Sequence, residues 1–101
     1  MGQGYIKAWK RHRKMTLNLV VPTGEIKFVL FDDRLDSTTC GQFFSIHLSR
    51  NNYQRLTVPP LVWMGVQGVS EDLNMLLNIA SIPHDPEEVD QCDFQEIKYL
   101  W

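Results

Sequence analysis

Several features that would assign a small protein to a class are scarce in this sequence. Its 101 residues contain two cysteines, Cys40 and Cys92, without CxxC spacing, which argues against a disulfide framework and favours a reduced, cytoplasmic setting. No run approaches the ~18 uninterrupted apolar residues of a membrane-spanning helix, so we expect no membrane partner. No glycine-rich phosphate loop follows a strand. We expect one small domain over residues 1–101.

Histidines are too few and too scattered to predict a metal site. His12, His47 and His84 are far apart, and none has a second histidine two residues away. Lys10 stands two residues before His12, and its ammonium would repel a cation. We therefore expect no metal and no other cofactor. Cys40 has no histidine tied to it by spacing, and a surface thiol is the simpler interpretation.

Charge is nearly balanced overall but uneven along the chain. The net charge of −2 implies no polyelectrolyte role, yet residues 1–14 carry five bases and no acid, while residues 71–101 carry eight of the twelve acids. A basic start and an acidic end can complement each other across a fold or a dimer, or the basic end can bind an anion. Nucleic-acid binding through residues 7–14 is less well supported, because the run is short and lacks a pair of stacking aromatics.

Short runs rich in β-branched and aromatic residues alternate with turn residues. We expect strands at residues 6–12, 16–21, 25–31, 42–48, 54–58 and 61–66. Residues 73–80 fit a strand or two helical turns, and the short strands around them favour a strand. A short acidic helix from Pro86 and packing of residues 97–101 on the body are also expected. The pattern predicts an all-β sandwich or jelly roll.

The basic segment leads directly into the second of these strands and is the first candidate site. If it is extended, alternation places Ala8, Lys10 and His12 on one face. The other face then carries the intervening residues, Lys7, Trp9 and Arg11. An imidazole and an ammonium on one face can line a cavity, and the alternative is a solvated basic edge.

Five short motifs follow one another through most of the chain. They are residues 4–14, the turn Thr23-Gly24-Glu25-Ile26, the loop Asp32-Asp33-Arg34 with Ser37-Thr38, the turn Leu48-Ser49 with Asn51, and residues 58–66. Together they resemble the dTDP-4-dehydrorhamnose 3,5-epimerase family of cupin-type jelly rolls. The resemblance implies a double-stranded β-helix, a homodimer, and a cavity for a nucleotide-diphospho-sugar. Because the first motif lies so close to the start, it also implies that the family's usual N-terminal strands are missing.

The resemblance further implies a mechanism, from which this sequence departs at several positions. In the family, a histidine oriented by a carboxylate removes protons beside a ketone, and a tyrosine returns them from the other face. Lys10 falls where that histidine stands, Met64 replaces a second histidine, and Asn78 falls near the tyrosine's place. Lys7 retains the basic character of a phosphate-contacting arginine, and Asn18 falls near a strand lysine.

The candidate residues follow from this comparison. The catalytic candidates are Lys10, His12 and Asn78, and the candidate substrate contacts are Lys7, Asn18, Arg34, Trp63 and Met64. Lys10 has three interpretations: a base whose pKa burial has lowered, a cation that binds phosphate, or a relic in a non-catalytic homologue. His12 is an alternative base, because its ordinary pKa lies near neutrality, or else a hydrogen-bonding residue of the cavity wall.

We therefore predict an epimerase or isomerase that transfers a proton next to the ketone of a nucleotide-linked 4-keto-deoxysugar. One alternative is the 3,4-ketoisomerase activity of a related branch. The other is a non-catalytic homologue that binds a nucleotide sugar or has a structural role.

Overall fold

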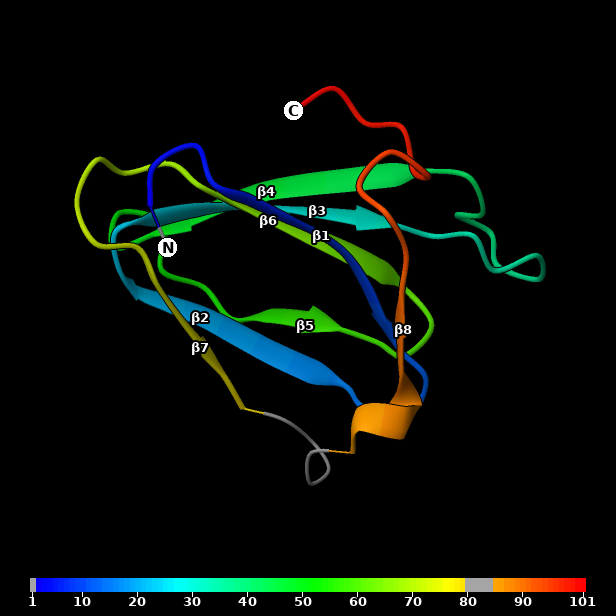
Figure 1. Ribbon diagram of the computed structural model, residues 1–101. Helices are drawn as coiled ribbons and strands as arrows, with labels where there is room; N and C mark the ends of the chain where they lie inside the picture. Colours follow the sequence, from blue (N-terminus) through cyan, green and yellow to red (C-terminus); the bar gives the residue numbers. More distant parts are fainter. Residues whose placement is uncertain (1, 80–84) are drawn as a thin grey trace.

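In the computed structural model, residues 2–79 and 85–101 are described, and they form two antiparallel sheets that face each other (Figure 1). The elements are β1 (Ile6–His12), β2 (Leu17–Thr23), β3 (Glu25–Phe31), β4 (Phe43–Ser49), β5 (Leu56–Val58), β6 (Trp63–Gly68), β7 (Met75–Asn78), the 3-10 helix η1 (Pro86–Glu88) and β8 (Val89–Gln91). The larger sheet has the order β4-β3-β6-β1-β8, and the smaller has β5-β2-β7. The all-β prediction is confirmed.

Most expected strands are found, with ends that shift by a few residues. The segment at 73–80 forms a strand over Met75–Asn78, and the short helix from Pro86 is present as η1. The sequence did not predict β8, which is only three residues long. His84 and the end of the segment at 73–80 lie outside the described residues.

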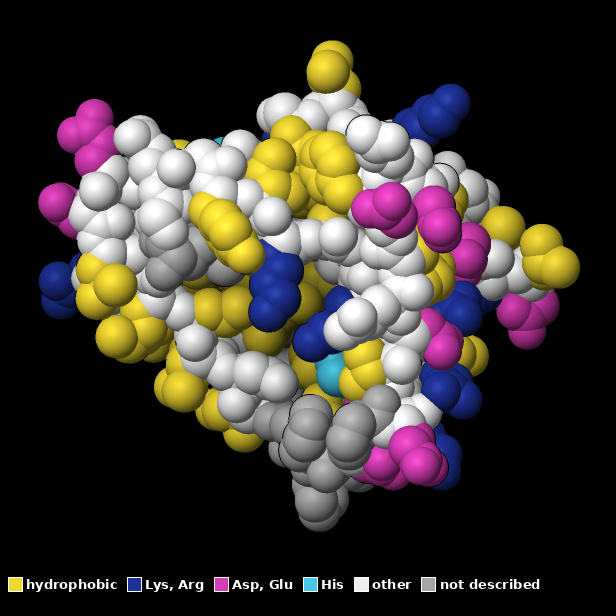
Figure 2. Space-filling model, in the orientation of Figure 1, with side chains coloured by type: hydrophobic (Ala, Val, Ile, Leu, Met, Phe, Trp, Pro, Cys, Tyr) yellow, Lys and Arg dark blue, Asp and Glu magenta, His cyan; other side chains and the backbone are white. Residues whose placement is uncertain are grey.

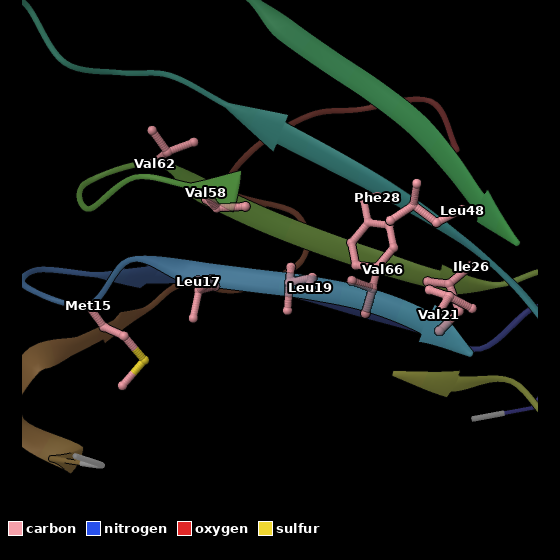
Figure 3. Packing of buried hydrophobic residues seen from close by; sticks show 10 residues of the cluster. All are labelled: Met15, Leu17, Leu19, Val21, Ile26, Phe28, Leu48, Val58, Val62 and Val66. Carbon is pink, nitrogen blue, oxygen red and sulfur yellow. The ribbon is translucent and has the colours of Figure 1, made fainter. Parts of the chain in front are cut away.

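The main core fills the space between the sheets. Alternate residues of β2, namely Leu17, Leu19 and Val21, are buried in one cluster with residues of β3 and β6 (Figure 3). The remaining buried members of this cluster are Met15, Ile26, Phe28, Leu48, Val58, Val62 and Val66. Because period-two alternation places these side chains on one face, burial of that face fixes the register of β2 against the larger sheet.

A second cluster covers the outer face of the larger sheet. Trp9 and Trp63 are buried there, and the C-terminal segment packs over them. The indole N–H of Trp9 donates to the carbonyl oxygens of Phe94 at 3.3 Å and Ile97 at 3.2 Å, while its ring lies 5.6 Å from that of Trp101. The prediction that residues 97–101 pack on the body is confirmed.

An irregularity in β1 corrects the expected alternation of its side chains. Lys7 pairs with Val66 and Lys10 with Met64, so two residues of β1 lie opposite Gly65, as in a β-bulge. Lys7 and Lys10 consequently face the space between the sheets, whereas Ala8 packs with the outer cluster. The prediction that Lys7 points away from Lys10 was wrong, because a bulge inverts the alternation on one side of it. The prediction that Lys10 and His12 share a face is confirmed.

Gly65 makes the bulge possible by its lack of a side chain. A Cβ at this position would lie 2.8 Å from the Ala8 Cβ and 2.8 Å from the Trp101 ring. The backbone of β1 and the C-terminal segment can therefore approach β6 this closely only over a glycine.

Candidate functional site

A cavity of about 380 Å³ opens between β1 and β8 of the larger sheet and β2 and β7 of the smaller. Figure 2 shows a hollow on this face, with a hydrophobic floor and with basic side chains and a histidine at its wall. The polar side chains of the lining are Lys7, Lys10, His12, Asn78 and Gln91. Its apolar floor comes from Leu17, Leu19, Met64, Val66 and Leu76, and Ala8, Trp9 and Cys92 complete the lining. An apolar hollow with a few convergent polar groups is typical of a small-molecule site.

His12 and Glu88 form a hydrogen-bonded pair at this cavity. The side chain of His12 is 13% exposed and that of Glu88 is 2% exposed. His12 Nδ1 bonds Glu88 Oε1, and the other carboxylate oxygen accepts from the backbone N–H groups of Lys14 at 3.0 Å and Met15 at 3.2 Å. Since an ionised carboxylate only accepts, Nδ1 carries the proton, and Nε2 is left as the acceptor.

The environment of Glu88 keeps it ionised. Burial raises its pKa, but the hydrogen bonds from His12, Lys14 and Met15 together outweigh burial and lower the pKa from 4.5 to about 2. Glu88 is therefore a fixed negative charge at neutral pH, and its hydrogen bond orients the ring of His12.

This lowered pKa predicts a pH-dependent stability. A group whose folded pKa lies below its unfolded value stabilises the fold above the unfolded pKa, and the stabilisation is lost as pH falls through the folded value. The free energy of unfolding should therefore fall between about pH 4.5 and pH 2. Urea denaturation of wild type and Glu88→Gln at several pH values measures this. The difference between the two proteins should shrink as pH falls, and a difference that stays constant would contradict the pairing.

Lys7 and Lys10 provide the cavity with positive charge. Lys10 is partly buried, Lys7 is exposed, and both line the hollow. Among the described residues, no carboxylate forms an ion pair with either ammonium. Two uncompensated cations beside an apolar floor can hold an anionic group such as a diphosphate.

Met64 and Asn78 also reach the cavity, as the sequence predicts. Met64 is paired with Lys10 across β1 and β6, and Asn78 lies on β7 in the smaller sheet. The Oδ1 of Asn78 accepts from the backbone N–H of Asn18 at 3.3 Å. No tyrosine lines the cavity in the described part of the chain.

The other three candidate contacts lie elsewhere. Asn18 alternates with buried Leu17 and Leu19, so its side chain points out of the smaller sheet and bonds Thr57 and Ile79. Trp63 belongs to the outer cluster. Successive residues of a strand point to opposite faces of the sheet. Asn18 and Trp63 therefore point away from the cavity, while their neighbours Leu19 and Met64 line it.

Arg34 is held within its own loop. Its Nε lies 2.9 Å from an oxygen of Asp32, and Ser37 and Thr39 donate to the same carboxylate. Arg34 first, and then the two hydroxyls, lower the pKa of buried Asp32 far below its ordinary value. This motif therefore stabilises a turn, and Arg34 is absent from the cavity lining.

Comparisons with known proteins agree with this geometry. No family model matches the chain. A dTDP sugar isomerase from Desulfovibrio desulfuricans G20 superposes with a TM-score of 0.91 at 35% identity, over 94% of this chain and 61% of that one. The chain thus resembles the dTDP-sugar isomerases and epimerases. A dTDP-4-dehydrorhamnose 3,5-epimerase from Bacillus anthracis, solved with TDP and PPi bound, shares the fold of this chain at a TM-score of 0.85 and 21% identity, over 99% of this chain and 59% of that one.

Two curated proteins with sequence similarity to this chain bear the names of biosynthetic proteins. The probable low-salt glycan biosynthesis epimerase Agl13 of Haloferax volcanii is 29% identical over 89 residues, which is 87% of this chain and 57% of the relative. The spore coat polysaccharide biosynthesis protein SpsL of Bacillus subtilis is 28% identical over 102 residues, 97% of this chain and 68% of the relative. The chain thus spans less than two thirds of Agl13 and of the D. desulfuricans isomerase.

Two other kinds of feature are not found in the described part of this chain. Among residues 2–79 and 85–101, no three His, Cys, Asp or Glu side chains lie together as metal ligands would. The same residues include no helix long and apolar enough to cross a membrane. Cys40 is exposed and Cys92 is half-buried, and both are free thiols.

Sequence reasoning missed Glu88, the partner of His12, and also Gln91, which lines the cavity from β8. Glu88 stands in an acidic tail with seven other carboxylates beyond residue 70, and its spacing does not distinguish it from them. The only local signal is its place at the end of the short helix begun by Pro86, directly before β8. Glu88 reaches His12 because β8, which follows Glu88 directly, pairs with β1.

Proposed function

We propose that this chain transfers a proton next to the ketone of a nucleotide-linked 4-keto-deoxysugar, as an epimerase or isomerase. The observation that supports the proposal most is the His12–Glu88 pair at a cavity that also holds two unpaired ammonium groups. A histidine oriented by a buried carboxylate is the arrangement that general-base chemistry requires.

His12 serves as the base in this proposal, in place of Lys10. Glu88 holds Nδ1–H, so the lone pair of Nε2 is available to remove a proton from the carbon beside the ketone. The imidazolium that forms can pass the proton to the neighbouring carbon on the same face, which is the step a ketoisomerase needs. Inversion by an epimerase needs a proton from the opposite face of the enolate, and in this proposal solvent water supplies it while the imidazolium gives its own proton back to solvent.

Lys10 and Lys7 carry the electrostatic part of the reaction. Removal of the proton leaves an enolate, and a fixed ammonium near the developing oxyanion lowers the energy of that species. Lys10 is two residues from His12 on the same face of β1, and Lys7 lies on the far side of the bulge. Lys7 is placed to hold the diphosphate while Lys10 contacts the reacting end.

A second candidate is the 3,4-ketoisomerase activity or a binding role without turnover. Asn78 favours it, because an amide cannot return a proton as the family's tyrosine does, and no described tyrosine lines the cavity. The proposal for the homodimer rests on β4, β5, β7 and β8, which are the outermost strands of the two sheets within residues 2–79 and 85–101 and whose edges a partner could cover. A cytoplasmic location stays a prediction.

Solvent exchange tests the function and separates these candidates. The purified chain is incubated in D₂O with a thymidine-diphosphate-linked 4-keto-6-deoxyhexose, and the sugar is followed by NMR. Deuterium at C3 or C5 with inversion supports an epimerase, whereas a ketone moved to C3 supports the ketoisomerase. Binding of the sugar nucleotide without any exchange would contradict catalysis and leave the binding role.

Removal of the Lys10 charge should weaken ligand binding and chemistry together. Lys10→Met keeps the length and apolar stem of the side chain but removes an ammonium that lines the cavity. We expect about tenfold weaker binding of thymidine diphosphate, equivalent to about 1.4 kcal/mol, as measured by calorimetry. Lys98→Met, at an exposed position outside the cavity lining, is the matched control and should bind as wild type does. Equal affinity in Lys10→Met would remove this lysine from the site.

A further inference from the structure

We propose that Arg11 and Asp90, on the outer face of the larger sheet, are positioning residues that hold Glu88 against His12. The proposal rests on the proposed function for its effect on turnover, while the effect on the His12–Glu88 pair can be observed without turnover. Neither residue lines the cavity, so neither is placed to touch a ligand there, and we assign their influence to the position of the pair.

Arg11 is fixed from three directions. Its Nε and Nη2 lie 3.1 and 2.8 Å from Oδ2 of Asp90, and its Nη1 lies 3.5 Å from Oδ1 of Asp33. Its guanidinium stacks over the Trp63 ring at 4.6 Å, and the Trp63 indole N–H donates to Asp33 at 2.9 Å. A guanidinium held this way has little rotamer freedom left to lose, so it is a rigid anchor for Asp90.

Asp90 is held by two arginines that flank His12 in the sequence. Its second oxygen lies 3.3 Å from Nε of Arg13. Arg11 and Arg13 thus reach Asp90 from one side of β1, while His12 between them faces the cavity on the other. The segment 11–13 is therefore attached to residues 88–90 on both faces of β1. The ion pairs of Asp90 lie on the outer face, and the His12–Glu88 pair lies on the face towards the cavity.

The backbone ladder between β8 and β1 is short. The strand is three residues long and, within residues 2–79 and 85–101, lies at the edge of its sheet beside β1. Backbone bonds continue this pairing at both ends, between Trp9 and Cys92 at 3.3 Å and from the Arg13 N–H to the Glu88 carbonyl oxygen at 2.7 Å. Its register places Asp90 opposite Arg11 and Val89 opposite His12. Glu88 directly precedes that pair, as the last residue of η1. A slip or a rotation of β8 would consequently move the Glu88 carboxylate away from Nδ1, and the Arg11–Asp90 contact opposes that motion.

The energetic role fits positioning better than stability. The side chains of Arg11 and Asp90 are each 27% exposed, and partly exposed ion pairs usually contribute little to folding stability. Misplacement of a reacting group by about 1 Å can nevertheless lower a rate about 100-fold. Loss of the ion pair should therefore affect the geometry of the base more than the folding of the chain.

The test uses Asp90→Asn, which preserves shape and removes the charge. NMR of the histidine ring in the free protein should show a protected Nδ1–H for His12 in wild type and its loss in the variant. The Glu88 carboxyl, followed by carbon NMR, should titrate with a pKa that rises from about 2. Where turnover is measurable, kcat should fall 10- to 100-fold with KM nearly unchanged.

Glu25→Gln is the matched control. It neutralises a carboxylate that lies 2.9 Å from the His47 imidazole, on strands β3 and β4 and outside the cavity lining. Its His12 and Glu88 signals should equal those of wild type.

A protected Nδ1–H and an unchanged Glu88 titration in Asp90→Asn would overturn the positioning role, whatever the activity. If Asp90→Asn does not fold, Arg11→Lys takes its place. This variant keeps the positive charge but lacks the guanidinium that contacts Asp90 through two nitrogens, and the same His12 and Glu88 NMR signals are followed. Absence of exchange in wild type would refute the proposed function and leave the NMR result to decide the positioning.

Discussion

Replacement of His12 by glutamine is expected to lower the rate of deuterium exchange into the 4-keto-sugar by about 10²- to 10⁴-fold, the usual contribution of a general base. The glutamine amide can still donate a hydrogen bond to Glu88, so the buried carboxylate keeps a partner. It cannot accept a proton at neutral pH. The loss should therefore appear in the exchange rate, while the affinity for thymidine diphosphate changes little.

His47→Gln is the control for this experiment. His47 also pairs with a carboxylate, that of Glu25, but it is exposed on β4 and far from the cavity lining. Its exchange rate should equal that of wild type. Wild-type exchange in His12→Gln would show that another group, with Lys10 as the first candidate, removes the proton.

Replacement of Trp9 by alanine is expected to lower the free energy of unfolding by about 3–5 kcal/mol. Trp9 is 2% exposed, and its indole ring fills the space between the larger sheet and the C-terminal segment. The substitution also removes the N–H that two carbonyl groups of that segment share. Urea denaturation followed by circular dichroism measures the loss.

Leu100→Ala is the matched control within the same segment. The Leu100 side chain is 97% exposed, so its truncation should change the free energy of unfolding by no more than about 0.5 kcal/mol. Similar losses for both variants would mean that Trp9 does not anchor the C-terminal segment as described.

The regular parts of the fold were predictable because local chemistry determines them. The strand at 25–31 is found with both predicted ends. β-Branched and aromatic residues fill it, and Gly24 is the turn residue that separates it from β2. Gly24 has φ +81°, and a Cβ there would lie 2.4 Å from the Leu73 carbonyl oxygen. A glycine after Pro22-Thr23 is thus a turn signal with a steric cause.

The site was predictable only in part, because two of its determinants are not local. The motif comparison and alternation placed Lys10 and His12 on one face, and both line the cavity. Alternation could not anticipate the bulge opposite Gly65, which brings Lys7 to the same face. Glu88 lies 76 residues from His12, and no periodicity within either segment indicates their contact.

The site also suggests how the chain accommodates a lysine where relatives are expected to have their base. His12 stands two residues further along β1, which corresponds to about 7 Å in an extended strand. We expect the substrate to sit correspondingly deeper towards η1, with Lys10 beside the ketone oxygen. Lys10→His would test this, because a second imidazole without the Glu88 partner should not restore exchange to a His12→Gln background.

A crystal structure with a thymidine-diphosphate-linked 4-keto-sugar tests the proposed site most directly. We predict the diphosphate beside Lys7 and Lys10, and the carbon next to the ketone within about 3–3.5 Å of Nε2 of His12, the separation of a reactive contact. A sugar nucleotide bound outside this cavity, or one whose ketone faces away from His12, would contradict the assignment.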